Sequence, residues 1–438
     1  MARNGDIGRR DFLKTGAKGV AGLAVASAAA GVLHPERVLG ANDRVNVAVV
    51  GPGHRGRDLI RLFHEHSKDL NMEIVAVCDI WKEPRELAAK LVEDLSGKRP
   101  QMVRNTDELY SMKGIDAVII ATADFQHAYH ATEAVKAGKD VYVEKPLAHT
   151  MKDAKTVLKA VSESDRVVQV GTQRRSGPNY QAAAEFIQSG KFGRITFVEL
   201  VWNVNQPKRW RRFDELKRIR KEDTDWGRYL INLPYRPWNP RYYLEFRLFW
   251  PFSSGIPDQW MVHQIDTVAW FAQDPYPETC IATGRLEMWK DGRTNPDTFT
   301  AVFEYAKGFQ VLYTSRQHNS YGGVKELYFS NLGTLDLKRN KITGEGGLEA
   351  RHSLDGKAHK LPDMDLPKAT TVTGVKATGG TASLHMRNWM ECIRSRKQPN
   401  APIEAGYAHS VALCMAIESM QTGRKVRFDR ATQEIVPV

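Results

Sequence analysis

The chain has 438 residues, 42% of them hydrophobic and 26% charged, which is typical of soluble globular proteins and excludes collagen-like, disordered and membrane-embedded classes. Its net charge of +12 permits nucleic-acid binding, but much of the charge lies at the amino end and in residues 208–221, so we expect an anionic substrate or envelope surface instead. The length allows two domains. Four widely spaced cysteines without a C-x-x-C pair predict neither a disulfide framework nor a metal site.

Residues 1–41 are typical of an export signal followed by a linker. The stretch 8–14 contains paired arginines followed by Phe12 and Leu13, and a weakly apolar, Ala- and Gly-rich run occupies 17–33. This arrangement resembles a twin-arginine signal, which predicts transport of the folded protein to the periplasm. The run has too few Leu and Ile residues for a stable membrane span. The alternative interpretation is a basic tail beside a helix.

Residues 42–170 alternate short apolar runs with helical stretches, the pattern of a parallel sheet with crossover helices. The predicted strands are 45–50, 73–77, 116–120, 140–143 and 167–170. The predicted helices are 55–66, 84–95, 126–137 and 152–164. The sequence therefore predicts an α/β fold that begins with a Rossmann domain, a doubly wound parallel sheet.

In residues 171–438 the strands become longer and alternate polar with apolar side chains, which predicts an α+β domain with a large, mainly antiparallel open sheet. The predicted strands are 195–202, 279–287, 299–305, 309–315 and 326–330, and the closing helices are 382–395 and 405–421. Between the first two strands, residues 203–257 are rich in Trp, Tyr, Arg and Pro and show little periodicity. Such a stretch indicates a long functional loop.

A glycine-rich turn joins the first predicted strand to the first helix and reads Gly51-Pro52-Gly53-His54-Arg55-Gly56. Gly51 permits the tight turn, Gly53 lets the backbone approach a diphosphate, and Gly56 allows close helix packing. Amide groups at the helix start then face the diphosphate. Asp79, at the end of the next strand, can accept hydrogen bonds from both ribose hydroxyls and repels a 2′-phosphate, so we predict NAD rather than NADP.

The fourth predicted strand delivers Glu144-Lys145-Pro146 to the carboxyl edge of the sheet, where ligands bind in open α/β folds. Burial and a nicotinamide cation would lower the pKa of Lys145, which suits this side chain to acid–base chemistry near neutral pH. The alternative is a lysine that extends into solvent. In the glycine turn, His54 and Arg55 are placed to contact phosphate, with a surface role as the alternative.

Taken in order along residues 45–430, these motifs resemble the glucose-fructose oxidoreductase and inositol dehydrogenase (Gfo/Idh/MocA) family. Besides the glycine turn and the lysine motif, the resemblance rests on Ala121-Thr122 followed by His127, on residues 171–175 and on residues 259–266. It implies hydride transfer between a nicotinamide and a carbon that bears a hydroxyl, on a sugar, cyclitol or glycoside. It also implies a homodimer or homotetramer built on the open sheet.

By this resemblance, Lys145 hydrogen-bonds the reacting hydroxyl and His263 relays its proton. The family places an aspartate four residues before this histidine, where this chain has Gln259. We therefore take Asp258 as the supporting catalytic residue and Asp266 as a residue that orients His263. The resemblance further assigns to the cofactor site Thr122, His127, Glu144 and Gln173, and to the substrate site Arg174 and Gln259.

Residues 203–250 are expected to form the substrate side of the site. Trp210 and Trp238 can stack on sugar faces, and Arg236 can bind hydroxyls or an acidic group. Further candidates of the same kinds are Trp226, Tyr235, Tyr242, Tyr243, Arg209, Arg211 and Arg212. The alternative is that the aromatic residues pack the loop itself and the arginines are solvated.

Export removes an enzyme from the recycled nicotinamide pool, so we expect tightly bound NAD(H) and a redox-neutral cycle on a small carbohydrate. In one version the hydride moves between two substrates. In another, transient oxidation of a glycoside at C3 permits elimination, hydration and re-reduction, which would make the chain an NAD-dependent glycoside hydrolase. A non-catalytic sugar-binding protein is the alternative from another class. Export and the lack of a basic recognition helix disfavour nucleic-acid binding.

Overall fold

The computed structural model describes residues 43–368 and 380–438, so the predicted export signal lies outside the described residues. Both sheets belong to one compact unit, Val45–Val438. The boundary predicted between residues 170 and 171 stays a prediction. No helix in the described ranges combines the length and the apolar character needed to cross a bilayer.

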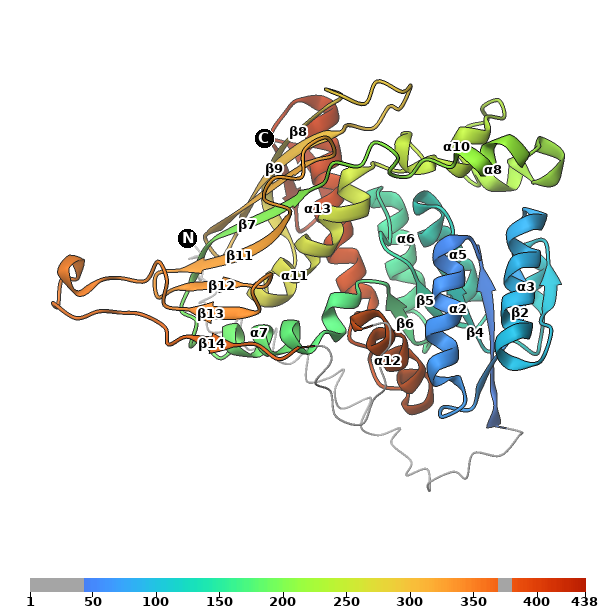
Figure 1. The fold of residues 1–438 in the computed structure, drawn as a ribbon, viewed down its shortest axis with the longest axis horizontal. Helices are drawn as coiled ribbons and strands as arrows, with labels where there is room; N and C mark the ends of the chain where they lie inside the picture. The colour runs from blue at the N-terminus through green and yellow to red at the C-terminus, as the bar shows by residue number, and fades with distance from the viewer. Residues whose placement is uncertain (1–42, 369–379) are drawn as a thin grey trace, which may run out of the picture. The chain divides into compact units, whose positions relative to one another are not determined.

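The amino-terminal sheet is a doubly wound parallel sheet (Figure 1). Its strands are β1 (Val45–Val50), β2 (Met72–Cys78), β3 (Gln101–Val103), β4 (Ala117–Ile120), β5 (Asp140–Val143) and β6 (Val168–Val170). The helices are α2 (His54–Ser67), α3 (Lys82–Ser96), α4 (Thr106–Ser111), α5 (His127–Lys136) and α6 (Met151–Ser162). The strand order β3-β2-β1-β4-β5-β6, with every pair parallel, is that of a dinucleotide-binding fold and confirms the predicted Rossmann domain. Strands β4 and β5 are buried on both faces, which is why they appear as continuous apolar runs.

The second sheet has ten strands within the described residues. They are β7 (Ile195–Asn203), β8 (Pro277–Arg285), β9 (Thr298–Tyr305), β10 (Phe309–Arg316), β11 (Val324–Ser330), β12 (Thr334–Asp336), β13 (Lys341–Thr343), β14 (Met364–Asp365), β15 (Val426–Asp429) and β16 (Glu434–Pro437). Their order is β14-β13-β12-β11-β7-β10-β9-β8-β15-β16, and β7 with β10 is the parallel pair among antiparallel neighbours. In β9 every second residue is buried, so one face packs inward and the other stays open. This confirms the predicted antiparallel open sheet.

Carboxyl-terminal helices tie the two sheets together. Helix α13 (Ile403–Thr422) is buried along most of its length because it packs on β8, on α6 and on α11 (Val262–Ala272). Helix α12 (Thr381–Ser395) lies against the Rossmann sheet and places Met386 and Trp389 in its core. The edge of the first sheet is thereby held against the helices of the second, and the candidate site lies where they meet.

Residues 204–256, which we call the covering segment, connect β7 to a π-helical turn, η6 (Pro257–Met261). The segment is not structureless, because it contains the short helices α8 (Phe213–Arg218), α9 (Trp226–Leu230) and α10 (Pro240–Leu244). In Figure 1, α8 and α10 lie over the end of the Rossmann domain that carries α3 and β2. The segment has its own apolar cluster, formed mainly by Trp226, Tyr229, Leu230, Phe246, Leu248, Phe249 and Phe252.

Candidate active site

The glycine turn after β1 leaves an open space where a diphosphate belongs. Gly51 has φ of +70°, and a Cβ there would lie 2.7 Å from Cγ2 of Thr122. A Cβ on Gly56 would lie 2.7 Å from the carbonyl oxygen of Gly51, whereas one on Gly53 would meet nothing within 4 Å. The amino end of α2 has no side-chain cap and no acidic residue in its first turn. Its free amide groups and the space above Gly53 therefore fit the diphosphate of a dinucleotide.

Asp79 follows β2 at the same edge and suits an adenosine ribose. Its Oδ1 accepts a hydrogen bond from the amide of Trp81 at 2.9 Å, and the hydroxyl of Tyr243 in α10 donates to the same carboxylate. Burial raises the pKa of Asp79 to about 6. A carboxylate in this position accepts from ribose hydroxyls and repels a 2′-phosphate, so the site fits NAD. The sequence indicates a stacking role for Tyr243 and does not reveal its contact with Asp79.

One cavity of about 1360 Å³ links the glycine turn to the covering segment. Sites for single small ligands measure roughly 300–1,000 Å³, so a dinucleotide and a second ligand can share this space. The predicted site residues that line the cavity are Gly51, Gly53, His54, Arg55, Asp79, Thr122, His127, Glu144, Lys145, Gln173, Trp210, Gln259 and His263. The predicted site residues outside its wall are Gly56, Arg174, Arg236, Trp238 and Asp258.

Lys145 and His263 come together in this cavity. The ammonium group of Lys145 donates to the carbonyl oxygens of Asp258 and Gln259, at 3.3 and 3.2 Å, in the π-helical turn. Burial lowers the pKa of Lys145 to about 8, although the carboxylates of Asp124 and Glu144 oppose this shift. Burial, followed by the charge of Lys145, also lowers the pKa of His263 well below its ordinary value. The site thus offers a lysine that titrates near neutral pH beside a neutral imidazole.

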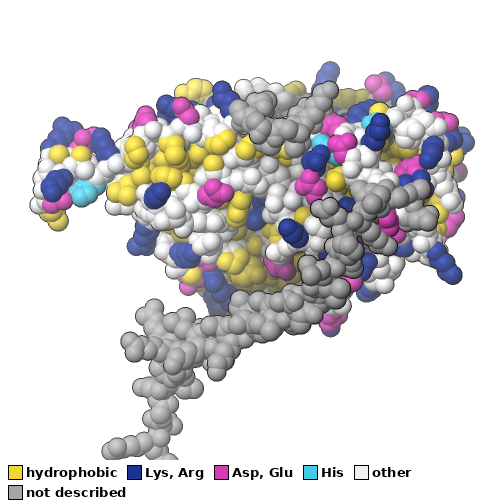
Figure 2. Space-filling view, turned by 90° about the horizontal axis from the view of Figure 1, so that it is seen from below, with side chains coloured by type: hydrophobic (Ala, Val, Ile, Leu, Met, Phe, Trp, Pro, Cys, Tyr) yellow, Lys and Arg dark blue, Asp and Glu magenta, His cyan; other side chains and the backbone are white. Residues whose placement is uncertain are grey.

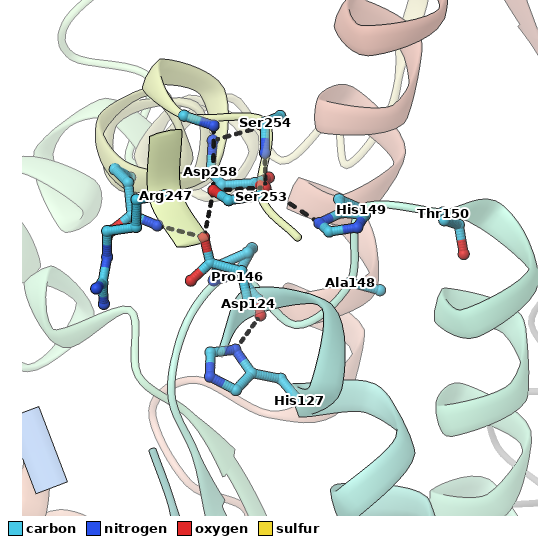
Figure 3. A network of polar contacts seen from close by, with 12 residues as sticks. Asp124, His127, Pro146, Ala148, His149, Thr150, Arg247, Ser253, Ser254 and Asp258 are labelled. Carbon is cyan, nitrogen blue, oxygen red and sulfur yellow. Dashed lines mark hydrogen bonds and ion pairs between the residues drawn. The ribbon is translucent and has the colours of Figure 1, made fainter. Parts of the chain in front are cut away.

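Asp124 is the carboxylate that the sequence analysis missed. It follows β4 and is 2% exposed, and its Oδ2 accepts a hydrogen bond from the hydroxyl of Ser253 at 2.6 Å (Figure 3). The same oxygen accepts from the amide of Gln259 at 2.5 Å. Gln259 occupies the position where the family has aspartate, and this contact places an acid next to it from the other sheet. The signal that could have revealed Asp124 is its position just after a central parallel strand.

Asp258, the predicted supporting residue, points away from the cavity. Its Oδ2 accepts from the amide of Ser254 at 2.6 Å and lies 3.1 Å from Nδ1 of His149 (Figure 3). A π-helical turn has a wider repeat than an α-helix, which changes the side that each residue faces. The turn directs Gln259 to the cavity and Asp258 to His149. Asp124 therefore stands beside Asp258 as a candidate for the supporting role, and both carboxylates act to raise the pKa of Lys145.

Other predicted site residues form hydrogen bonds or ion pairs with neighbouring protein residues. Arg55 donates from Nε to Glu144 at 2.7 Å and from Nη2 to Gln173 at 3.3 Å, so it fixes the lysine motif, and its contact with phosphate stays a prediction. Arg174 forms an ion pair with Glu326 at 2.6 Å. The remaining contacts of this kind are Asp266 with Arg175 at 2.9 Å, His127 with the carbonyl of Pro146 at 2.7 Å, and His54 with Glu215 at 3.5 Å. Asp266 thus pairs helix α11 with Arg175, and its role in orienting His263 stays a prediction.

Aromatic residues divide between the cavity wall and the interior of the covering segment. Trp210 lines the cavity and packs on Trp260 with ring centres 5.1 Å apart, and Trp202 stacks on Trp260 at 5.9 Å. Trp238 instead packs on Trp226 at 5.2 Å, and Arg236 lies over the ring of Phe252 at 5.2 Å, both inside the segment. From the predicted stacking and arginine set of this loop, the cavity is therefore lined by Trp210, Tyr243, Arg209 and Arg212. Among the residues that the structure describes, no group of His, Cys, Asp and Glu has the arrangement of a metal site.

A diphosphate cradle beside a buried lysine places the molecule among the Rossmann proteins that bind a nicotinamide dinucleotide. Sequence comparison specifies the family. Residues 45–172 match the NAD-binding Rossmann domain of the Gfo/Idh/MocA oxidoreductase family, and residues 229–428 match its C-terminal alpha/beta domain. The chain belongs to this family, as its motifs predicted.

Relatives agree with this assignment. An inositol 2-dehydrogenase of Serratia proteamaculans is 36% identical over 151 residues, which are 34% of this chain and 43% of that protein. The chain thus spans less than half the length of the curated relatives it matches. In fold, it is similar to the WlbA dehydrogenase of Bordetella pertussis in complex with NADH and UDP-GlcNAcA (TM-score 0.63, 18% identity, 88% of this chain, 99% of that one). It is also similar to myo-inositol 2-dehydrogenase of Lactobacillus plantarum (TM-score 0.62, 16% identity, 88% and 99%).

Proposed function

We propose that the chain is an NAD-dependent oxidoreductase that takes a hydride from a carbon bearing a hydroxyl group on a carbohydrate. The observation that carries this proposal is the position of Lys145, with its pKa lowered by burial to about 8, in one cavity with the glycine turn and His263. A general acid or base works best when its pKa lies near the working pH. The name of the Serratia relative, an inositol 2-dehydrogenase, supports a polyol as substrate.

Lys145 and His263 have different roles in moving the hydroxyl proton. NAD, when bound, supplies the acceptor for the hydride. Lys145 in its neutral form accepts the hydroxyl proton while the C–H bond breaks and the carbonyl forms, so the substrate loses one hydride and one proton. His263 is neutral because its pKa lies well below its ordinary value, so it can pass this proton onward only while it releases a proton from its other ring nitrogen. The two carbonyl oxygens of the π-helical turn hold the lysine in place throughout.

The covering segment supports a cofactor that stays bound. Its contacts with the Rossmann domain include Arg218 with Glu83 at 2.8 Å, Arg228 with Asp107 at 2.6 Å, and Glu215 with His54 at 3.5 Å. Tyr243 adds its contact with Asp79 and packs edge-on against Trp81 at 6.1 Å. These links place the segment across the adenosine end of the crevice, where it would oppose release of a dinucleotide.

Retention of NAD suits the proposed export. Twin-arginine transport carries folded proteins, so a cofactor bound before transport would travel to the periplasm with the chain. A retained cofactor must be regenerated where it sits. Each cycle is then redox-neutral, and the hydride returns to a carbonyl of a second substrate or to the same substrate after a bond has been cleaved.

A homodimer or homotetramer through the open face of the second sheet is part of this proposal. The exposed side chain of Ile281 lies beside Val302, which pairs with Leu312 on the same face. Phe197 and Phe329 extend this apolar row on neighbouring strands. Figure 2 shows hydrophobic side chains gathered on the half of the molecule that carries this sheet. Burial of such a row against a second copy is favourable.

The test is to purify the full chain, denature it and identify the released nucleotide by mass spectrometry. Bound NAD or NADH in stoichiometric amount is the expected result. The loaded protein is then offered hexoses, cyclitols, uronates and glycosides, and hydride transfer is followed through nicotinamide absorbance while bond cleavage is followed by chromatography. Transfer without added NAD supports the retained-cofactor cycle, and cleavage of a glycoside assigns the hydrolase version.

Two results would reject the proposal. Protein that contains no nicotinamide and does not bind added NAD excludes the cofactor role. Protein that binds both NAD and a sugar, yet transfers no hydride with any substrate class, is a sugar-binding protein that has kept the fold.

A further inference from the structure

Most arginines of the covering segment fall into two groups. Those with carboxylate partners include Arg211 and Arg241, both bound to Glu245, and Arg218 and Arg228, bound across to the Rossmann domain. The cavity is lined by three others that have no carboxylate partner among the described residues: Arg209, Arg212 and Arg247. An unpaired guanidinium in a partly buried wall is costly unless a ligand neutralises it.

Arg247 has the most restricted position of the three. Its Nε donates to Oε1 of Gln259 at 2.8 Å, and its guanidinium lies over the ring of Phe246 at 4.3 Å. Its Nη1 and Nη2 atoms donate to no described residue, and Figure 3 shows the guanidinium pointing away from the network around Asp124. Burial lowers the pKa of Arg247, but an arginine remains charged. The side chain is therefore fixed by one nitrogen and presents two free donors.

These free donors lie close to the reacting end of the cavity. Gln259 contacts Arg247 with its amide oxygen and Asp124 with its amide nitrogen, and its backbone oxygen accepts from Lys145. A group held by Arg247 is thus a short distance from the hydroxyl that Lys145 would deprotonate. The crevice for the cofactor diphosphate, above Gly53, is built by a different part of the wall.

The neighbouring wall supplies a surface for a sugar ring. Trp210 lines the cavity, and Arg209 lies over the ring of Trp260 at 5.6 Å. Aromatic faces of this kind stack on the apolar side of a pyranose. Arg212 contributes a further positive charge to the same side of the cavity. A ligand that fits this end has a ring to stack and a negative group to pair.

We propose that the substrate is an anionic carbohydrate, a sugar acid whose carboxylate pairs with Arg247 while Arg209 and Arg212 add to the attraction. The inference rests on the proposed function, because it names the substrate class of the same cavity. The planar guanidinium offers two parallel N–H donors, which match the two oxygens of a carboxylate. A sugar phosphate has related chemistry and serves as a separate arm of the test.

Binding is measured first, on the full chain with its bound nucleotide, by calorimetry and by intrinsic tryptophan fluorescence. The probes are glucuronate, galacturonate and gluconate, the neutral parents glucose and galactose, and glucose 6-phosphate. We expect at least one acid to bind 10-fold or more tightly than its neutral parent, with the difference shrinking as salt is raised. Equal or undetectable binding of acids and neutral sugars overturns the inference.

The variant Arg247→Met keeps the length of the side chain and removes the charge. It is expected to abolish the preference for the acid while the nucleotide content stays unchanged. The matched control is Arg220→Met, because Arg220 belongs to the same segment but is exposed and paired with Asp223. Loss of nucleotide from Arg247→Met would assign this arginine to the cofactor and overturn the inference, as would tighter binding of glucose 6-phosphate than of every acid.

Hydride transfer separates this inference from the proposed function. Selective binding of a sugar acid without hydride transfer to any probe supports the anionic site and rejects the oxidoreductase. Hydride transfer from neutral sugars at the same kcat/KM as from their acids, unaffected by Arg247→Met, supports the oxidoreductase and rejects the anionic substrate.

Discussion

The glycine turn and the covering segment line one cavity, but different kinds of contact build them. The turn depends on neighbours in sequence, since Gly51, Gly53 and Gly56 act within a single strand-to-helix junction. The covering segment depends on partners far along the chain, such as Glu83 for Arg218 and Asp107 for Arg228. The comparison teaches that the cofactor side of the site is a local property of the sequence, whereas the substrate side is a tertiary one.

The largest expected effect comes from Lys145→Met, which leaves the glycine turn intact. Hydride transfer should fall by about 10³-fold, within the range that general acid–base groups contribute, while bound nucleotide is retained. Single-turnover absorbance of the nicotinamide measures the rate, and mass spectrometry measures the nucleotide. Lys152→Met, on the exposed side of α6, serves as the control. Undiminished transfer would remove Lys145 from the mechanism.

The glycine turn can be tested by comparing two alanine substitutions. Gly51→Ala introduces a Cβ at positive φ and against Thr122, so it should cost about 1–3 kcal/mol of unfolding free energy. Gly53→Ala meets only open space, so it should cost less than about 0.5 kcal/mol. Its affinity for NAD should nevertheless fall about 10-fold, or about 1.4 kcal/mol, because the methyl group enters the diphosphate position. Denaturant unfolding and calorimetry measure the two quantities, and unchanged NAD affinity in Gly53→Ala would contradict the cradle.

The pH dependence of hydride transfer tests the interaction between Lys145 and Asp124. Oxidation needs neutral Lys145, so its rate should rise with pH through about 8, and reduction, which needs the ammonium form, should fall over the same range. Asp124 favours the charged lysine, so Asp124→Asn should lower the pKa of Lys145 and move both profiles to lower pH. Asp94→Asn, on the exposed surface of α3, should leave the profiles in place. A profile that does not move would show that Asp124 acts only as a structural hydrogen-bond acceptor.

The smallest effect is expected from the links of the covering segment. The double variant Arg218→Ala and Arg228→Ala removes two exposed ion pairs to the Rossmann domain, so overall stability should change little. Dissociation of NAD into a scavenging solution should still accelerate several-fold, because the segment is then tied down less firmly. Arg220→Ala, which breaks a pair inside the segment, should leave the dissociation rate unchanged. Identical rates in all three proteins would separate the segment from cofactor retention.

Local patterns allowed both sheets, the glycine turn and the lysine motif to be predicted. In the glycine turn, the tight bend, the diphosphate position and the start of the helix lie within six residues. The spacing of the three glycines is therefore enough to predict the local backbone geometry. Strands β1 and β5 were predicted at their observed bounds because continuous apolar runs between helices are typical of a parallel sheet. The short strand β3 escaped prediction, since two of its three residues are exposed and show no pattern.

Residues whose roles depend on distant partners could not be assigned from the sequence. Asp258 and Gln259 are adjacent, and the π-helical turn decides which of them faces the cavity, which apolar periodicity does not reveal. Arg236 and Arg247 lie in the same arginine- and aromatic-rich stretch, so the sequence does not distinguish them. In the structure, Arg236 covers Phe252 inside the segment, whereas Arg247 lines the cavity. Trp238 likewise packs inward on Trp226. An aromatic-rich loop therefore predicts that its aromatic side chains pack on one another, and does not show which of them can stack on a sugar.

The hydroxyl of Tyr243 donates to the carboxylate that an adenosine ribose would use. A dinucleotide that arrives after the chain has closed must share or displace this phenol and disturb the helix that carries it. A dinucleotide present while the chain is still folding meets no such competitor. Nucleotide-free protein should therefore take up added NAD slowly, at the rate at which this phenol moves away from Asp79.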